Sequence, residues 1–363
     1  MKICFVLDLI PARPMGGVKI IFKYANHFAQ SGCEVRIAFT SSFLGSLKKY
    51  IPYKIRKRMV SLYLIKGPSW FKLDRRIRRI CIDKIDNDNI PDGDIIFATA
   101  VTTAEAVANL SYKKGKKFYL IQGYENWAKG DQYVKKTYNL GMHNITISDW
   151  LYNIVYKESG IKPTLIKNPI DTKIIKLIID PAVRNAHSIA MICQNDEQKG
   201  FIYGLQAICK IKEMFPDTEC TIFGISKRRS DIPAWIKYRR NVKERELVKI
   251  YNESAVFLCS SISEGYGLCG AESMACGCAL VSTDYEGVHS YADNNINALL
   301  SPVKDVDALV KNIMKLFNDT DFRVLLASRG NKDIQKLSWE KAFILLDEMI
   351  DENIKDSPQS KHK

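Results

Sequence analysis

KICFVLDLIPARPMGGVKIIFKYANHFAQSGCEVRIAFT (residues 2–40) decides the fold, because it reads as strand, turn, helix and strand. Residues 2–10 and 33–40 are apolar on both faces, which is typical of strands in a parallel sheet covered by helices. Between them, apolar side chains recur on one helical face, and Gly32 follows where a glycine commonly ends a helix. This order predicts a βαβ unit.

The rest of the chain repeats this alternation. Further strands are expected at 94–100, 117–123, 144–148, 188–194, 219–225, 255–261, 278–284 and 298–302, with helices such as 204–214 and 306–317. The alternation pauses at TLIKNPID (164–171), where an Asn-Pro pair signals a turn. We therefore predict an α/β protein of two Rossmann-like, doubly wound domains, 1–168 and 169–338, facing across a cleft. A helix at about 339–356 is a candidate to pack back on the first domain, and the tail 356–363 is expected to fray.

The composition fits this size and class. A chain of 363 residues is long enough for two domains, because single cores rarely exceed about 250 to 300 residues. No run of about 18 apolar residues predicts a transmembrane helix, and the first residues lack the features of a signal peptide. The ten cysteines show no metal-site spacing, so we expect a reduced, cytoplasmic protein without a metal or other cofactor.

The formal net charge of +14 is concentrated in one segment. Residues 48–79 contain twelve lysines and arginines and a single acid, Asp74, interleaved with tyrosine, leucine, tryptophan and phenylalanine. Nucleic acid, an anionic membrane surface or a phosphorylated ligand could each use such a segment, and a solvated basic surface is the alternative. The interleaved apolar residues favour contact with anionic lipid.

A second stretch, SEGYGLCGAESMACG (263–277), carries the chemistry. It follows the predicted strand 255–261, so it forms an exit loop and the start of a helix, where ligands of parallel sheets collect. Its glycines let a ligand approach the backbone, and a helix start suits phosphate. The carboxylates of Glu264 and Glu272 would repel phosphate, so we expect them to bind hydroxyl groups. A nucleotide-sugar satisfies both conditions. The alternative is that Glu264 is a surface charge of the loop and Glu272 a first-turn residue favoured by the helix dipole.

The block EGYGLCGAE, followed by MACG and CALVSTDYEG, resembles the E-x7-E signature of glycosyltransferase family 4, the retaining group 1 glycosyltransferases of GT-B fold. The Gly16-Gly17 turn, NPID at 168–171 and the Lys199-Gly200 pair stand in the family's order. The resemblance implies an enzyme that transfers a hexosyl or deoxyhexosyl group from a nucleotide diphosphate-sugar to a hydroxyl acceptor, with retention of configuration.

The resemblance also implies a role for each matching residue. Glu264 would bind the transferred sugar and Lys199 would neutralise the departing phosphates, which makes them the implied catalytic pair. Glu272 would hold the ribose hydroxyls. The complete donor site implied in this way is Gly16, Gly17, Lys199, Glu264, Gly267, Leu268, Cys269 and Glu272. The departing phosphate would itself take the acceptor's proton, and no essential metal is implied.

The chain departs from the family at two places. Cys193 and Gln194 stand where the family usually has an arginine. The segment IQGYENW replaces a family histidine near the reacting sugar, so Gln122 and Glu125 become the acceptor-side candidates. His289 is kept as a candidate donor contact.

We therefore expect a peripheral enzyme at the inner face of a membrane, with a glycan or lipid-linked acceptor in polysaccharide, lipopolysaccharide or glycolipid assembly. A nucleotide-sugar epimerase of the same fold is an alternative, and it would interconvert the donor without an acceptor. A nucleic-acid or anionic-surface binding protein that uses 48–79, and a non-catalytic scaffold, are the alternatives from other classes. The sugar, the nucleobase, the linkage and the oligomeric state stay open.

Overall fold

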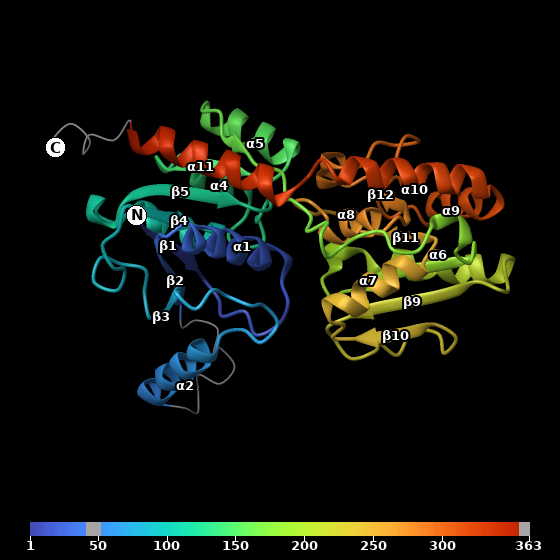
Figure 1. The fold of residues 1–363 in the computed structure, drawn as a ribbon, viewed down its shortest axis with the longest axis horizontal. Helices are drawn as coiled ribbons and strands as arrows, with labels where there is room; N and C mark the ends of the chain where they lie inside the picture. The colour runs from blue at the N-terminus through green and yellow to red at the C-terminus, as the bar shows by residue number, and fades with distance from the viewer. Residues whose placement is uncertain (41–51, 356–363) are drawn as a thin grey trace. The chain divides into compact units, whose positions relative to one another are not determined.

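The computed structural model describes residues 1–40 and 52–355. The chain divides into two units, Met1–Ile166 with Phe343–Lys363, and Lys167–Ala342. Each unit is built on a parallel sheet flanked by helices (Figure 1). The predicted class, an α/β protein with two Rossmann-like domains, is confirmed. The tail 356–363, expected to fray, lies outside the described residues, as do the first basic residues of 48–79.

The sheet of the first unit has seven strands. They are β1 (Lys2–Leu7), β2 (Glu34–Thr40), β3 (Arg78–Ile82), β4 (Ile95–Ala98), β5 (Lys116–Ile121), β6 (His143–Thr146) and β7 (Thr164–Leu165). Their order is β3-β2-β1-β4-β5-β6-β7, and all neighbours pair in parallel. The chain winds outward in opposite directions from β1 and β4, so the topological switch point lies between these two strands.

Helices cover this sheet, and the last helix of the chain is one of them. The described helices are α1 (Gly16–Gln30), α2 (Tyr53–Lys66), α3 (Val101–Ala108), α4 (Asp131–Thr137), α5 (Asp149–Ser159) and α11 (Trp339–Lys355). On α11, the Phe343 ring stacks on His27 of α1 with 4.1 Å between ring centroids. Asp347 contacts His27 Nε2 at 2.9 Å. The C-terminal helix is therefore held against α1.

The second unit repeats the architecture with six parallel strands. They are β8 (Ser188–Cys193), β9 (Glu219–Gly224), β10 (Lys237–Arg240), β11 (Val256–Cys259), β12 (Ala279–Thr283) and β13 (Ala298–Ser301). Their order is β10-β9-β8-β11-β12-β13, which puts the switch point between β8 and β11. The helices are α6 (Phe201–Met214), α7 (Glu244–Glu253), α8 (Leu268–Ala275), α9 (Val306–Asn318) and α10 (Thr320–Ile334).

A buried arginine fixes the far end of α8. Arg184 is 6% exposed, and its guanidinium donates to the carbonyls of Tyr251, Ser254 and Cys276, the last at 2.6 Å. Asn331 of α10 donates to the Ala275 carbonyl at 2.7 Å. Because the last carbonyls of a helix lack partners within the helix, these donors satisfy them and hold α8 in place.

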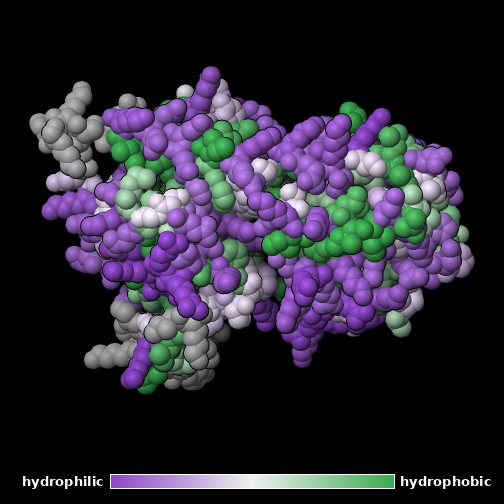
Figure 2. All heavy atoms as spheres, in the orientation of Figure 1, coloured by the Kyte–Doolittle hydropathy of each residue, from purple (hydrophilic) through white to green (hydrophobic). Residues whose placement is uncertain are grey.

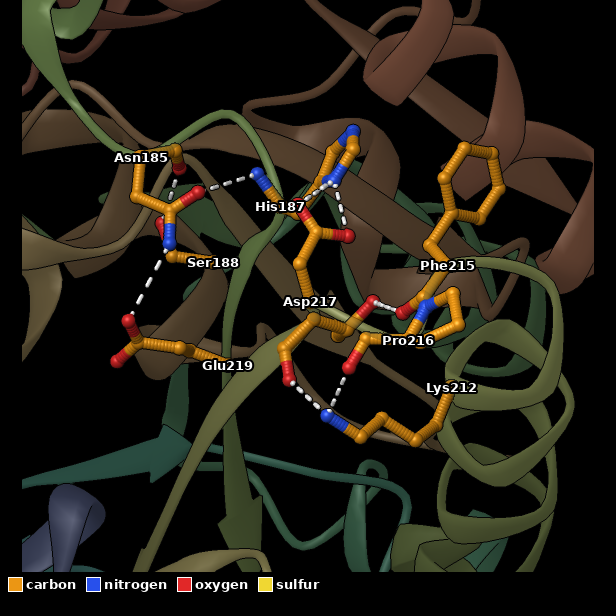
Figure 3. A network of polar contacts seen from close by, with 9 residues as sticks. Asn185, His187, Ser188, Lys212, Phe215, Pro216, Asp217 and Glu219 are labelled. Atoms are coloured by element: carbon orange, nitrogen blue, oxygen red, sulfur yellow. Dashed lines mark hydrogen bonds and ion pairs between the residues drawn. The ribbon is translucent and has the colours of Figure 1, made fainter.

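A polar network ties together the amino ends of β8 and β9 (Figure 3). His187 Nδ1 lies 2.8 Å from an Asp217 carboxylate oxygen, and this hydrogen bond lowers the pKa of Asp217. Lys212 of α6 donates to the Thr218 carbonyl at 3.0 Å, and the His187 ring stacks on Phe317. Ligands of parallel sheets bind at the opposite, carboxyl ends, so we interpret this network as structural.

No helix within 1–40 and 52–355 combines the length and the apolar character needed to cross a membrane.

Replacing Arg184 by Ala should lower the free energy of unfolding of the second unit by about 3 kcal/mol, because buried carbonyls lose their donor. Urea denaturation followed by circular dichroism measures the change. The control Arg245→Ala removes an exposed arginine of α7 and should cost less than about 0.5 kcal/mol. Equal stability of the two variants would contradict the bracing role.

Candidate functional site

Two exit loops lie in backbone contact at the switch point of the second unit. The Ile262 amide, beyond β11, donates to the Gln198 carbonyl, beyond β8, at 2.7 Å. Gly200 has φ +55°, and a Cβ added there would lie 2.0 Å from the Ser260 carbonyl oxygen. Glycine is therefore required for this close approach, and the loops are locked together at one point.

The implied catalytic residues meet beside this lock. Lys199 Nζ lies 3.0 Å from Glu264 Oε2, and the Ser261 hydroxyl donates to the other oxygen of Glu264. Burial opposes the charged form of Lys199, but the charge and hydrogen bond of Glu264 outweigh it, so the pKa of Lys199 is raised. The side chains keep 25% and 18% exposure, so a ligand can still reach both.

Helix α8 begins directly after the Glu264 loop. Gly267 precedes it with φ +94°, and Leu268 and Cys269 supply its first amides. Helix geometry leaves these amides without intrahelical acceptors and gives them partial positive charge, which suits a phosphate. Glu272 lies further along α8 and is 9% exposed. The structure thus brings the cation, the carboxylate loop and the helix start into one region.

A pair of buried tyrosines lies under the glycines of this loop. The hydroxyls of Tyr285 and Tyr291 are 2.7 Å apart, and both residues are almost fully buried. A Cβ at Gly267 would lie 1.8 Å from Tyr285 Oη, and one at Gly270 would lie 2.4 Å from Tyr291 Oη. Sequence reasoning missed these tyrosines. The available signal was two glycines three residues apart, which indicates that something bulky packs beneath them.

Two other candidate positions of the second unit are His289 and the Cys193-Gln194 pair. His289 contacts Asp284 at 2.7 Å and is 56% exposed. Cys193 is fully buried at the end of β8, followed by Gln194, and burial raises the pKa of its thiol while the charge of Arg229 opposes that shift. The Arg229 guanidinium is also 5.0 Å from the Phe201 ring centre. Arg229 is thus a basic group close to the position where an arginine was expected, although it also pairs with Asp231.

The first-unit candidates lie around the start of α1. Gly16 and Gly17 open this helix, and a Cβ on Gly17 would lie 3.1 Å from Gln122 Oε1. Glu125 follows in the same loop as Gln122 and accepts a hydrogen bond from the Val101 amide at 2.6 Å. Gly17 and Gln122, which follow different strands of the same sheet, therefore lie close together.

Among the described residues, no three or more His, Cys, Asp or Glu side chains gather closely enough to hold a metal ion. The cysteines are free thiols. The expectation that no cofactor is needed stays a prediction.

Comparison of the whole structure with solved structures defines the class. Sucrose-phosphate synthase from Thermosynechococcus elongatus has a TM-score of 0.76 and 15% sequence identity, covering 98% of this chain and 100% of that one. HepE of Anabaena, solved in complex with UDP and glucose, has a TM-score of 0.73 and 13% identity, covering 97% and 100%. At these identities the likeness concerns the fold, and the chain has the GT-B fold expected from its sequence.

Sequence comparison relates part of the chain to a known family. Residues 183–333, which lie within the second unit, match the family model of group 1 glycosyl transferases. O-antigen chain mannosyltransferase B of Escherichia coli is 28% identical over 106 residues, 29% of this chain and 27% of that protein. Phosphatidyl-myo-inositol mannosyltransferase of Mycolicibacterium smegmatis is 21% identical over 170 residues, 45% and 44%. The matches thus span less than half the length of these relatives. The group 1 resemblance is confirmed, and the narrower assignment to family 4 stays a prediction.

Gly267→Ala should lower the free energy of unfolding of the second unit, because the new methyl group overlaps the Tyr285 hydroxyl. The loss should exceed by about 2 kcal/mol the cost of placing an alanine at a positive φ. Gly160→Ala is the matched control, since Gly160 has φ +69° and no described atom within 4 Å of an added Cβ. Urea denaturation measures both variants.

If the overlap is the cause, the double variant Gly267→Ala/Tyr285→Phe should regain part of the loss, because the hydroxyl is removed. Equal losses in Gly267→Ala and Gly160→Ala would contradict the packing that we describe.

Proposed function

We propose that this protein is a retaining glycosyltransferase that moves a sugar from a nucleotide diphosphate-sugar to a hydroxyl acceptor. The observation that carries the proposal is the contact of Lys199 with Glu264 at a topological switch point, directly before the first amides of α8. The group 1 match of residues 183–333 supports transfer of a glycosyl group. HepE, a protein of the same fold, was solved in complex with UDP and glucose, and this complex supports a nucleoside diphosphate donor.

The proposed donor lies with its diphosphate at the start of α8. The amides of Leu268 and Cys269 and the ammonium of Lys199 would bind phosphate oxygens, where negative charge develops as the bond from the sugar C1 to phosphate breaks. Glu264 would accept hydrogen bonds from hydroxyls of the sugar, and Glu272 from the ribose. The acceptor oxygen forms the new bond to C1 on the same face, and its proton passes to the departing phosphate.

The contact between Lys199 and Glu264 gives this scheme a specific step. In the absence of donor the two charges neutralise each other at 3.0 Å. A diphosphate would compete with Glu264 for the ammonium, and the sugar hydroxyls would compensate the carboxylate that is left. Binding of the complete donor therefore gives both Lys199 and Glu264 a new partner. Inorganic phosphate alone would pair with Lys199 and leave the Glu264 carboxylate without a compensating partner.

The relatives support a saccharide or lipid-linked acceptor. One is named for the O-antigen chain and another for phosphatidyl-myo-inositol, and both names specify mannosyl transfer. We extend the proposal to hexosyl transfer in the assembly of a cell-surface polysaccharide or glycolipid. An epimerase is distinguished by incubating the donor alone, because an epimerase would interconvert it and a transferase would not.

Lys199→Ala should lower the rate of transfer by about 10²- to 10³-fold, because the leaving diphosphate loses its cation. Glu264→Gln should impair the sugar donor more than the free nucleoside diphosphate, since the carboxylate contacts the sugar. Release of nucleoside diphosphate from a panel of donors measures turnover, and thermal shift measures binding. Lys210→Ala is the control, because Lys210 is a half-exposed lysine that pairs with Asp307. Normal turnover by Lys199→Ala would overturn the assigned role.

We propose further that α2 contacts an anionic membrane surface that presents the acceptor. Two of the aromatic residues that suggested this contact pack against the first unit: Trp70 donates to the Pro11 carbonyl at 2.9 Å, and Phe71 lies against Phe22. Support now comes from exposed aliphatic side chains on α2, at 54%, 51% and 57% exposure for Ile55, Met59 and Leu62. Their spacing puts them on one helical face. The sequence of α2 contains five lysines and arginines and no acid, which complements anionic lipid. Hydrophobic atoms, drawn in green, are visible at the place of α2 (Figures 1 and 2).

Replacing Ile55, Met59 and Leu62 together by Ser should abolish flotation of the protein with phosphatidylglycerol vesicles at low salt, because the helix loses the side chains that enter the lipid. The control replaces exposed apolar residues elsewhere, Ile161, Val183 and Ile344, by Ser. It should float like the parent protein. Failure of the parent protein itself to float would refute the membrane contact and leave the donor site unaffected.

A further inference from the structure

The segment that joins β7 to β8 carries an exposed aliphatic surface. Four of its side chains, which we call the aliphatic ridge, are 43%, 40%, 65% and 75% exposed: Ile174, Leu177, Ile178 and Val183. Figure 2 shows hydrophobic residues, drawn in green, as a band across the face of the second unit that it presents. Single exposed aliphatic side chains are ordinary on a protein surface, whereas a group of them in one short segment indicates a contact surface.

Buried polar side chains hold the backbone of this segment in place. Asn252 of α7 is 1% exposed, and its Oδ1 accepts from the Ile178 amide at 2.7 Å and from the Ile179 amide at 3.1 Å. From the other side, the Arg184 guanidinium donates to the Ile179 carbonyl at 2.7 Å. The segment therefore has a fixed backbone although this part of it belongs to no helix or strand. Its aliphatic side chains are held at the surface by specific hydrogen bonds, unlike those of a frayed loop.

The segment already has its own contacts with the core of the second unit. Ile175, which lies next to Ile174, is 0% exposed. Leu177 lies close to Gly277, because a Cβ added to that glycine would be 2.7 Å from Leu177 Cδ1. The ridge is thus a set of aliphatic groups in excess of what anchors the segment. Covering it would stabilise an assembly, because apolar surface would leave water.

The charges around the ridge are balanced, although the formal net charge of the chain is +14. The charged groups of the segment, the partner of one of them and the charges that flank Asn252 on α7 are three cations and three anions: Lys173, Lys176, Lys249, Asp180, Glu253 and Glu340. Anionic lipid or nucleic acid would be attracted by an excess of positive charge, which this set lacks. A second copy of the same surface is favoured, since the lysines of one copy can meet the acids of the other.

We infer that the aliphatic ridge is the interface at which two copies of this chain form a two-fold symmetric dimer. In such a contact the same surface of each copy faces the other, so one ridge covers its counterpart. Specific interfaces bury about 800 Å² of each partner, with an apolar centre and a polar rim. The ridge supplies the centre and the balanced charges supply the rim. Because Gly277 follows the end of α8, this interface and the proposed donor site lie at opposite ends of that helix.

Sedimentation velocity of the full chain measures the assembly directly and uses no donor, so its result is independent of the proposed transferase function. A reductant prevents the free thiols from cross-linking two chains. The parent protein should form a species of twice the 41.4 kDa chain mass at concentrations up to about 100 μM. A monomer throughout this range would overturn the interface, and so would an open-ended series of larger species, which a two-fold contact cannot produce.

Ile178→Asp should raise the dissociation constant of the dimer at least about tenfold, because a charge enters the apolar centre and faces a like charge. The exposed Val183 allows a second variant, Val183→Asp, with the same expected effect. Ile161→Asp is the matched control, since Ile161 is 72% exposed in the first unit, and it should associate like the parent protein. Circular dichroism confirms that each variant is folded. Association of Ile178→Asp and Val183→Asp with the parent's constant would show that the ridge is not the interface.

Opposite charges at one position test the symmetry of the contact. Ile178→Asp and Ile178→Lys should each be mainly monomeric at a concentration where the parent protein is dimeric. An equimolar mixture of the two should form a heterodimer, because the carboxylate of one copy meets the ammonium of the other. Mixing cannot repair a folding defect, so recovery supports the self-facing surface. A mixture that stays monomeric would overturn the two-fold contact.

Discussion

Backbone contact between the exit loops of β8 and β11 is the constraint on which the proposed donor site depends. Gly200 makes it possible, because any side chain there would overlap the Ser260 carbonyl. With the loops locked, Lys199 and Glu264 are held within ion-pair distance even though 65 positions separate them in the sequence. The lock also sets where α8 begins, and Arg184 and Asn331 hold the other end of that helix. The site is thus fixed from both ends by groups that need not touch a ligand.

The candidate residues of the two units lie at the same position in their sheets, but the charges around them differ. Both carry polar side chains where the strand order reverses, which is where parallel sheets leave room between diverging loops. In the second unit a lysine and a helix start supply positive charge, so an anionic ligand is favoured. In the first unit Asp8 and Glu125 supply carboxyl groups, which are hydrogen-bond acceptors.

The sequence predicted the inner strands and the edge strand β13, and missed the edge strands β3, β7 and β10. β3 and β10 read RRICI and KYRR, and their charges hide the apolar pattern while they protect a sheet edge from other chains. β7 has two residues, too few to show a period. Local spacing was enough to assign the glutamates and most glycines of the proposed donor site to one loop and one helix, whereas Lys199 entered only through the family resemblance. Tyr285, Tyr291 and Arg229 could not be predicted, because only the folded sheet brings them to those positions.

Trp70 and Phe71 show that composition alone does not predict where an aromatic side chain packs. Trp70 and Phe71 favoured a lipid contact in the sequence, yet both pack on Phe22 and stabilise the first unit. Tryptophan and phenylalanine bury large apolar areas, so within a domain they are drawn to the core first. What stays exposed on α2 is aliphatic, and three such side chains on a helix with no acid are enough to complement an anionic surface. The proposed membrane contact therefore rests on the charge and exposed aliphatic side chains of α2 and not on Trp70 and Phe71, because charge must stay near water and aromatic rings need not.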